Sequence, residues 1–412
     1  MSNNTSVSNS IDHIFRSEYS KLVSILVGKF GANCIDVIED AIQEALYKAM
    51  RMWSYQESPK DPGKWLYRVA HNQVIDTLRR SNKSVEYNPE LEKGEESPHS
   101  MNEHSIDDDQ LMMIFACCHP SMKESEQIML SLKLLCGFSN KEIARAFMKN
   151  TEAVKKAITR AKQKFKEEVG ELQLPNEGQL MGRVRAVIKV IYLIFNNGYT
   201  AVEGESLLKK DVCEDAIRLA LIIHQKEGYS APELKALLSL MLFNFSRFDA
   251  RVSDELELLT LDKQDRSKWD KELMNRAHIF FGQSASGQSF SRYHFESAIA
   301  REHALAQSFE NTNWKQILDL YNLMNRYYPS PTVSLNRIVA IDQAEGAKSA
   351  LKQLNNLNGK NYTNNHLYYA IKGDLEIKLN NKGAKDSLLK AIDLTDNLKE
   401  RGFLKSKLAC LH

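Results

Sequence analysis

The chain has 412 residues, of which 43% are hydrophobic and 26% are charged, and its formal net charge is +2. This composition excludes a collagen-like chain, wholesale disorder and a disulfide scaffold, and the length predicts two or three domains. Glycine numbers 18 and proline 9, well below the roughly 50 that average usage gives for both together. The deficit favours a mostly helical protein.

No run of the sequence approaches the roughly 18 apolar residues of a membrane span, so we expect no contact with a membrane. The first ten residues are polar and lack the features of a signal peptide. Six cysteines lie mostly inside apolar helical patterns, as buried thiols do in a reducing cytoplasm. They are Cys34, Cys117, Cys118, Cys136, Cys213 and Cys410. We therefore expect a cytoplasmic protein.

Residues 11–81 are predicted to form three helices. One carries an apolar stripe from Ile38 to Trp53 and has acidic and amide side chains on its other side. Another begins at Pro62, because Asp61 can cap it and proline suits the first helical position, and it runs to about Arg80. Its apolar residues spread beyond one face, so we expect it to be covered on more than one side.

Residues 82–106 hold no periodic apolar pattern and are rich in acidic residues. Nine acids and one lysine lie between Glu86 and Asp109. Like charges keep such a segment extended, which predicts a flexible linker. A solvated tether is one interpretation, and an acidic tether that mimics nucleic acid inside a basic channel is the other.

Residues 107–168 predict a second small helical unit. Gly137 ends one helix, and the sequence SNKE at 139–142 is a capping box that opens the next. Thr151 is expected to cap the helix after that. A short helix, a tight turn and a basic helix together predict a helix-turn-helix.

The basic helix separates its residues into two arcs. Seven bases and one acid lie between Lys149 and Lys166. The expected core arc consists of Val154, Ile158, Ala161 and Phe165. The opposite arc consists of Lys155, Lys156, Thr159, Arg160, Lys162, Gln163 and Lys166. In a helix-turn-helix this arc enters the major groove, whereas in an ordinary amphipathic helix it is a solvated basic face.

Residues 171–412 are predicted to be helical. An apolar helix from Arg183 to Phe195 is expected to end at the sequence NNG at 196–198. From about residue 291 the pattern suggests repeats, because Ala384, Leu388 and Ala391 match the small–large–small positions of a tetratricopeptide helix. Helical hairpins of another kind remain an alternative.

Sequence motifs for catalysis are absent. There is no phosphate loop, dinucleotide fingerprint, serine elbow or zinc-hydrolase motif, so we expect neither an enzyme nor a cofactor. Cys117, Cys118 and His119 raise the hypothesis of a metal site, but adjacent cysteines cannot easily both ligate one tetrahedral ion. Buried thiols are the favoured interpretation.

Three motif pairs carry a family resemblance. Residues 39–44 (EDAIQE) and 62–80 (PGKWLYRVAHNQVIDTLRR) resemble region 2 of extracytoplasmic-function sigma factors. Residues 137–144 (GFSNKEIA) and 154–164 (VKKAITRAKQK) resemble their region 4. Residues 115–120 (FACCHP) and 192–199 (YLIFNNGY) look like a subgroup with a large C-terminal helical extension. That subgroup usually has an acidic residue at the place of Asn197.

The resemblance implies an all-α fold of two small sigma domains and a helical, repeat-like C-terminal domain. The implied parts are region 2 at 1–83, an acidic flexible linker at 84–106, region 4 with its helix-turn-helix at 107–170, a helical extension at 171–290 and tetratricopeptide-like repeats at 291–412.

The resemblance further implies that the chain is an RNA polymerase sigma factor, with core RNA polymerase and promoter DNA as partners. The implied polymerase contacts are Asp40, Gln43 and Glu44. The implied contacts to the −10 element are Trp65, Arg68, His71, Asn72, Arg79 and Arg80. The implied contacts to the −35 element are Thr151, Lys155, Lys156, Thr159, Arg160 and Gln163. The loop at 54–59 is expected to help open the −10 element.

The extension is longer than promoter reading requires, and we expect it to be regulatory. Its repeats would offer a surface to a protein or peptide partner. The candidate aromatic anchors are Tyr321, Tyr327, Tyr328, Tyr362, Tyr368 and Tyr369. A stand-alone helix-turn-helix regulator and a repeat scaffold with an incidental basic helix are the alternative functions.

Overall fold

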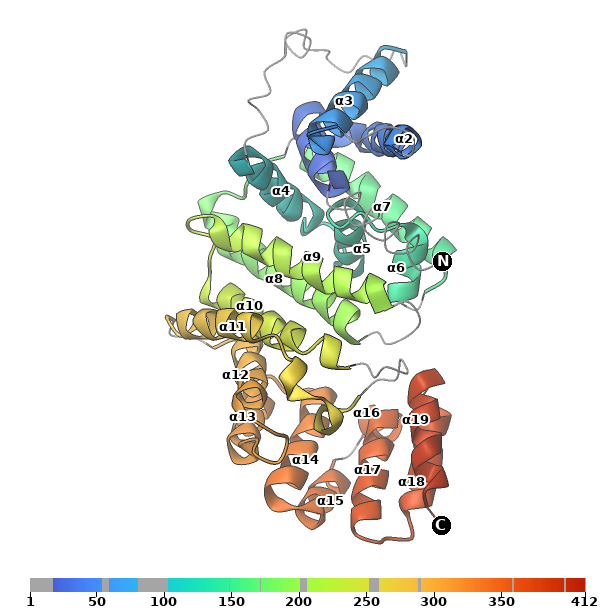
Figure 1. The fold of residues 1–412 in the computed structure, drawn as a ribbon, viewed down its shortest axis with the longest axis vertical. Helices are drawn as coiled ribbons and strands as arrows, with labels where there is room; N and C mark the ends of the chain where they lie inside the picture. The colour runs from blue at the N-terminus through green and yellow to red at the C-terminus, as the bar shows by residue number, and fades with distance from the viewer. Residues whose placement is uncertain are drawn as a thin grey trace. The chain divides into compact units, whose positions relative to one another are not determined.

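The computed structural model describes residues 18–53, 59–80, 103–147, 149–170, 172–200, 206–251, 259–287, 290–357, 359–395 and 398–411. Throughout these ranges the regular structure is helical and contains no strand, which confirms the expected all-α fold (Figure 1). The chain forms two compact units. The first unit comprises Met1–Ala201 and Leu208–Ser230, and the second comprises Val202–Leu207 and Ala231–His412.

The first unit begins with a helix over residues 18–30, followed by η1 (Ala32–Cys34), α2 (Ile35–Trp53) and α3 (Pro62–Arg80). Asp61 caps α3 as expected, since its carboxylate accepts from the Lys64 amide at 3.0 Å. Only Leu66, Ala70 and Val74 of α3 are fully buried, and its other apolar residues are half-buried. Helix α3 is therefore fully covered along one face and partly covered on both flanks of that face. The loop at 54–58 lies outside the described residues.

Four helices follow: α4 (Glu103–Cys117), α5 (Glu124–Leu134), α6 (Asn140–Ala146) and α7 (Thr151–Val169). Helix α4 begins inside the stretch expected to be linker. Most of that linker lies outside the described residues. The capping box is confirmed, because the Ser139 amide donates to Glu142 at 2.7 Å and the Glu142 amide donates to the Ser139 hydroxyl at 3.2 Å.

Helix α7 has the predicted buried face, but its cap lies one residue earlier than expected. Asn150 caps it, with Oδ1 accepting from the Glu152 amide at 2.8 Å, and Thr151 is the first helical residue. An asparagine in extended conformation places its carbonyl oxygen as well as a threonine would. The core arc is buried as expected and packs α7 on α5 and α6.

Helices α8 (Glu177–Thr200) and α9 (Ser206–Gln225) complete the described part of the first unit. The predicted end of α8 at residues 196–198 is wrong, because the helix continues through them. Asn197 Nδ2 donates to the Leu193 carbonyl at 3.0 Å, one turn back, and Gly198 is buried in the packed face. Asparagine and glycine favour the end of a helix, but α8 continues through them to Thr200.

The second unit begins with α10 (Pro232–Ser246), α11 (Lys271–Ser284) and α12 (Arg292–Leu305). The described residues between α10 and α11 include three short 3₁₀ helices: η4 (Asp249–Arg251), η5 (Leu261–Lys263) and η6 (Arg266–Lys268). Buried hydroxyls join the three long helices, since Ser297 donates to Ser239 at 2.8 Å and Ser239 donates to the Ala277 carbonyl at 2.9 Å. These polar groups are satisfied inside an otherwise apolar contact.

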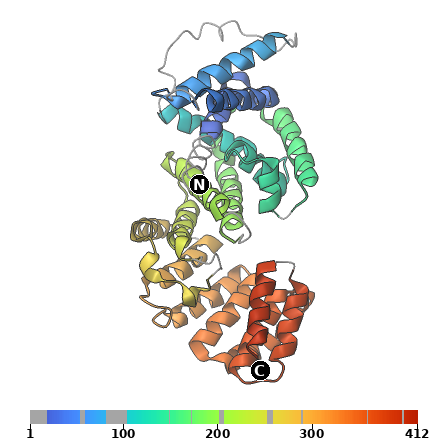
Figure 2. The same ribbon diagram turned by 45° about the vertical axis from the view of Figure 1, so that its right-hand side comes forward.

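The rest of the second unit is a succession of packed helices. They are α13 (Trp314–Tyr327), α14 (Pro331–Glu345), α15 (Ala347–Asn355), α16 (Lys360–Thr363), α17 (His366–Lys378), α18 (Ala384–Leu394) and α19 (Leu398–Ala409). Figure 2 shows the helices from α13 onwards, orange to red, lying side by side. Helices α13, α15 and α18 begin 33 and 37 residues apart. The spacing is repeat-like but drifts.

Two side chains of α18 show how closely these helices approach. Leu388 and Ala391 are fully buried, as the repeat pattern predicts. Gly373 on α17 faces Leu388, and a Cβ built at Gly373 would lie 2.8 Å from Leu388 Cδ2. The small residue is required by this close approach between α17 and α18.

Five of the six cysteines are buried, and Cys410 is exposed. Burial raises the pKa of the Cys118 thiol to about 12 and that of Cys117 well above its ordinary value. Within the described ranges, no cluster of His, Cys, Asp and Glu is placed to hold a metal ion. In the same ranges, no helix has the length and apolar character that crossing a membrane requires.

Candidate nucleic-acid interface

The predicted DNA-reading residues of α7 lie on its surface. Lys155, Lys156, Thr159, Arg160 and Gln163 are all exposed, and Thr151 is half-buried. The opposite side of α7 is buried against α5 and α6. The helix therefore cannot rotate to turn these side chains inward. The result is a rigid helix that presents cations and amide groups on one side.

Local hydrogen bonds limit what some of these side chains can offer a base. The Thr159 hydroxyl donates to the Lys155 carbonyl at 2.9 Å, which leaves its oxygen as an acceptor. Gln163 Nε2 donates to Glu167 at 2.6 Å. Lys155 pairs with Glu152 at 2.8 Å, but both side chains are more than half exposed, so this pair contributes little stability.

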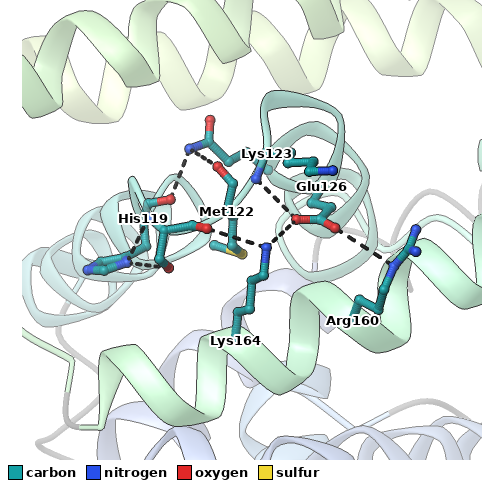
Figure 3. A network of polar contacts seen from close by, with 8 residues as sticks. His119, Met122, Lys123, Glu126, Arg160 and Lys164 are labelled. Atoms are coloured by element: carbon teal, nitrogen blue, oxygen red, sulfur yellow. Dashed lines mark hydrogen bonds and ion pairs between the residues drawn. The ribbon is translucent and has the colours of Figure 1, made fainter.

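A buried carboxylate on α5 anchors the middle of α7 (Figure 3). Glu126 accepts from Lys164 Nζ at 3.0 Å and from the Lys123 amide at 3.1 Å, and its other oxygen lies 3.8 Å from Arg160 Nε. Burial opposes ionisation of Glu126, but these hydrogen bonds and charges lower its pKa below the ordinary value. Arg160 is thereby oriented while its side chain stays 69% exposed.

The C-terminal part of the basic arc contacts α2 instead of solvent. Lys162 Nζ lies 3.0 Å from Asp36 and also pairs with Glu39, and Lys166 Nζ lies 2.5 Å from Asp36. The side chain of Lys162 is only 18% exposed. The sequence predicted that both lysines belong to the exposed arc, and this is wrong. Helical periodicity shows which residues share a face, but it does not show which other helix covers that face.

Helix α3 presents a second exposed face. Four of the predicted −10 residues fall within about 60° of one another at helical spacing: Trp65, Arg68, Asn72 and Arg79. Arg68, Asn72, Arg79 and Arg80 are exposed, and Trp65 is half-buried. Trp65 lies beside Trp53 from the end of α2, with ring centroids 5.6 Å apart. An aromatic pair next to basic side chains is typical of a surface that binds unpaired bases.

His71 occupies a different environment from the rest of the −10 set. Its ring lies 5.4 Å from Phe30 and 5.5 Å from Tyr67, and it is half-buried. Burial and the charge of Lys29 lower the pKa of His71, so the ring is neutral at pH 7. The structure thus places His71 between two aromatic rings at the edge of the exposed face.

The predicted polymerase contacts lie on the solvent face of α2. Asp40, Gln43 and Glu44 are exposed and follow one another at helical spacing. Sequence reasoning missed Tyr47 and Met50, which are 56% and 53% exposed on the same helix. The sequence indicated their exposure, since neither residue belongs to the apolar stripe of α2.

The helix over residues 18–30, before the linker, also contacts α4, which follows it. Gln110 on α4 donates to the Ser20 hydroxyl at 3.0 Å, and both residues are buried. Asp109 lies against Gly28, where an added Cβ would come within 3.3 Å of its carboxylate. Burial, together with the charge of Asp108, raises the pKa of Asp109 to about 6.

Two arginines of α8 and α9 fix the ends of α4 and α5. Arg183 donates to the Phe115 carbonyl at 2.6 Å, and Arg218 donates to the Leu135 carbonyl at 2.9 Å. The last carbonyls of a helix lack partners within it, and cations there oppose the helix dipole. Helices α8 and α9 therefore support the helix-turn-helix directly, and the boundary expected near residue 170 falls inside the first unit.

Comparison with known proteins agrees with this arrangement. A family model described as Sigma-70 region 2 matches residues 14–84, and one described as Sigma-70, region 4 matches residues 112–165. A third, described as a family of unknown function (DUF6596), matches residues 183–285. The chain belongs to the sigma-70 family, as an extracytoplasmic-function-like sigma factor with a C-terminal extension.

The extension is shared by a relative of similar length. An uncharacterized protein of Rhizobium meliloti (strain 1021) is 31% identical over 381 residues, which cover 91% of this chain and 90% of that protein. No solved structure gives a significant match. Sigma-70 regions 2 and 4 imply interaction with core RNA polymerase and promoter DNA, and sigma factors are not themselves enzymes.

The tyrosines of the repeats differ in accessibility. Tyr327, the last residue of α13, and Tyr328, which follows it, are exposed at 60% and 37%. The other four are half-buried, and three of them, Tyr321, Tyr362 and Tyr368, pack against the core of helices α12 to α17. Of the six candidate anchors, Tyr327 and Tyr328 are therefore the most accessible to a partner.

We predict that the Asp109→Asn variant is more stable than the wild type at neutral pH. The folded pKa of about 6 lies above the unfolded value, so the charged carboxylate destabilises the folded state fully above pH 6 and not below about pH 3.9. The melting temperature of the wild type should rise as the pH falls from 7.5 to 5, relative to the variant. Asp319→Asn, at an exposed position of α13, is the control. Equal pH dependence in wild type and Asp109→Asn would contradict this assignment.

Proposed function

We propose that this sigma factor directs promoter-specific initiation, with α3 reading the −10 element, α7 reading the −35 element and the second unit regulating both. The observation that carries the proposal is the exposed N-terminal half of α7, held by a buried face behind it. An α-helix fits the major groove, whose width is about 12 Å. The matches to region 2 and region 4 in one chain support a proposal with two reading surfaces.

For the −35 element, the side chains of α7 divide by the chemistry they offer. Arg160 can make two hydrogen bonds to the edge of a guanine, and it is already oriented by Glu126. Lys155 and Lys156 suit phosphates, which accept from any donor and carry no sequence information. Thr151, Thr159 and Gln163 complete the proposed contact set.

For the −10 element, we propose that Trp65 stacks on an unpaired base. Its neighbour Trp53 supports the ring from the side, and base–aromatic stacking contributes about 1–3 kcal/mol per base. Arg68, Arg79 and Arg80 would neutralise the backbone of the separated strand. Asn72 lies between them and can bond a base edge, while His71 would hold the neighbouring aromatic rings in place.

For core polymerase, the proposed contact is the stripe of Asp40, Gln43 and Glu44 on α2. Two acids and an amide on one exposed face are suited to basic residues of a partner. Tyr47 and Met50 extend that face with large apolar side chains, which are typical of an interface core.

The direct test is run-off transcription with core polymerase and a library of genomic fragments. A sigma factor gives transcripts that start at defined positions only when this chain is added. A stand-alone helix-turn-helix regulator binds DNA but yields no transcript with core polymerase alone. A repeat scaffold does neither.

Within that assay, we predict separable roles for two residues of α7. Arg160→Ala should weaken binding to the −35 element by about 1–3 kcal/mol and relax the preference at one base pair. Lys156→Ala should weaken binding to all sequences alike and reduce the slope of log affinity against log salt by about one unit. Lys348→Ala, at an exposed position of α15, should change neither. Unchanged promoter binding in both α7 variants would exclude α7 as the recognition helix.

We also predict that charge reversal on α2 abolishes holoenzyme formation. Asp40→Lys combined with Glu44→Lys inverts the proposed polymerase face, and exposed substitutions of this kind change stability by about 0.5 kcal/mol at most. Co-purification with core polymerase measures the effect. The matched control reverses Asp319 and Asp393, two exposed acids of the second unit. Wild-type recovery of core polymerase by the α2 variant would count against this face.

A third prediction concerns regulation by the second unit. A chain ending after Ser230 keeps α8, α9 and their arginine contacts to Phe115 and Leu135, whereas a chain ending after Glu171 loses them. We expect the longer truncation product to fold and to differ from the full chain in open-complex formation on one promoter. The shorter product should be unstable. Equal promoter activity of the full chain and the Ser230 product, in cells and in vitro, would remove the regulatory role.

A further inference from the structure

One acidic side chain lies in the middle of the basic arc of α7. Glu152 is the second residue of the helix, and its side chain is 67% exposed. At about 100° per residue, Thr159 and Gln163 lie within about 20° of it around the helix axis, and Lys155 and Lys156 lie on either side. The proposed −35 contacts therefore surround a carboxylate that has no assigned role.

Helix stability accounts for only part of this placement. An acid in the first turn of a helix interacts favourably with the helix dipole, and Lys155 Nζ lies 2.8 Å from Glu152 Oε1. Both side chains of this pair are more than half exposed, so the pair contributes little to the stability of α7. The N-terminus of α7 also has its own cap, because Asn150 accepts from the Glu152 amide at 2.8 Å. Stability therefore gives little reason for a carboxylate at this position.

Next to DNA, a carboxylate at this position is selective. In a helix-turn-helix the N-terminal residues of the recognition helix contact base edges, and Glu152 is one of those residues in α7. Phosphates repel a carboxylate, so its approach is favourable only where it accepts a hydrogen bond from a base. Lys155 reduces the repulsion, because its ammonium group has three donors and can reach a phosphate while it stays paired with Glu152.

The major-groove edges of the four bases differ in what they offer a carboxylate. An ionised carboxylate can only accept hydrogen bonds. Guanine presents two acceptors, thymine an acceptor and a methyl group, adenine a donor next to an acceptor, and cytosine only the N4 donor. Lys155 donates to Glu152 Oε1, and Oε2 makes no hydrogen bond to any described residue. One oxygen is thus available to accept from the amino group of a cytosine.

Position along the helix separates Glu152 from Arg160. Eight residues of helical rise, about 12 Å, lie between them, whereas successive base pairs are about 3.4 Å apart along the DNA axis. The two side chains also have different supports, since Arg160 lies against Glu126 and Glu152 against Lys155. They are therefore expected to face different base pairs.

We propose that Glu152 is a specificity-determining residue of α7, whose carboxylate accepts a hydrogen bond from the N4 amino group of a cytosine in the −35 element. This inference rests on the proposed function, because it requires α7 to lie in the major groove. It adds a second base-reading side chain to Arg160. It also gives Lys155 two roles, as a phosphate contact and as the support of the Glu152 carboxylate.

The first test selects −35 elements with the full-length chain bound to core polymerase. Templates with a randomised −35 element are bound, recovered and sequenced. The wild type should prefer cytosine at one position of either strand, and guanine or thymine there should lower recovery by about tenfold. Glu152→Ala should reduce this preference to about twofold or less, and Glu152→Gln should shift it towards adenine, because a glutamine amide pairs with adenine N6 and N7.

The matched control is Glu168→Gln. Glu168 is an exposed glutamate of the same helix, and it lies about 160° around the helix axis from Glu152. This variant should give the wild-type base profile. Identical profiles for the wild type and both Glu152 variants would overturn the inference.

The second test separates base reading from helix stability. A duplex without promoter elements measures non-specific binding by the same holoenzymes. Loss of a carboxylate close to phosphates should leave the non-specific affinity of Glu152→Ala unchanged or raise it by up to about threefold, while its affinity for the selected element falls by about tenfold. A weakened helix would instead lower both affinities and the melting temperature and leave the base profile unchanged, which would contradict a role in base reading.

The outcomes separate the two proposals. If neither Arg160→Ala nor the Glu152 variants change the −35 profile, α7 is not the recognition helix, and this inference fails together with that part of the proposed function. If Arg160→Ala changes the profile and the Glu152 variants do not, the role of Glu152 alone is wrong.

Discussion

The carboxylate of Glu39 is the charge on which the first unit depends. It is almost completely buried and accepts from Tyr19 at 2.8 Å, and it pairs with Lys133 and Lys162 from beyond the linker. A buried carboxylate is stable only when partners replace its lost hydration, and removal of one partner of a buried pair costs about 3–5 kcal/mol. Because those partners come from α5 and α7, the sequences of region 2 and region 4 constrain each other. Region 2 and region 4 are thereby folded around one shared charge.

The extension of this sigma factor begins inside the sigma module and not after it. Helices α8 and α9 pack with α4 and α5, and Arg183 and Arg218 supply hydrogen bonds that region 4 lacks on its own. The match to the family of unknown function spans residues 183–285 and so includes helices of both units. The matched segment therefore crosses the boundary between the two units.

Much of the fold could be predicted from the sequence, because its determinants are local. The capping box at residues 139–142, the Asp61 cap and the buried arc of α7 depend on neighbours within one or two turns. The errors involve contacts that are distant in sequence. Asn197 and Gly198 end a helix by their local preference, but burial of that face continues it. Lys162 and Lys166 belong to the basic arc by periodicity, and only the fold reveals Asp36 opposite them. The proposed reading residues of α7 and α3 lie mostly at exposed positions, which helical periodicity can indicate without knowledge of a distant partner.

The distribution of thiols gives the molecule a chemical asymmetry. Burial raises the pKa of Cys117 and Cys118, which keeps them protonated, and thiols react with electrophiles as thiolates. Cys410 is exposed, near the end of α19. Among the six cysteines, an alkylating dye would therefore select the last helix of the second unit. The native sequence supplies an attachment point for a fluorophore on the extension, and the sigma regions need no engineered substitution to stay unlabelled.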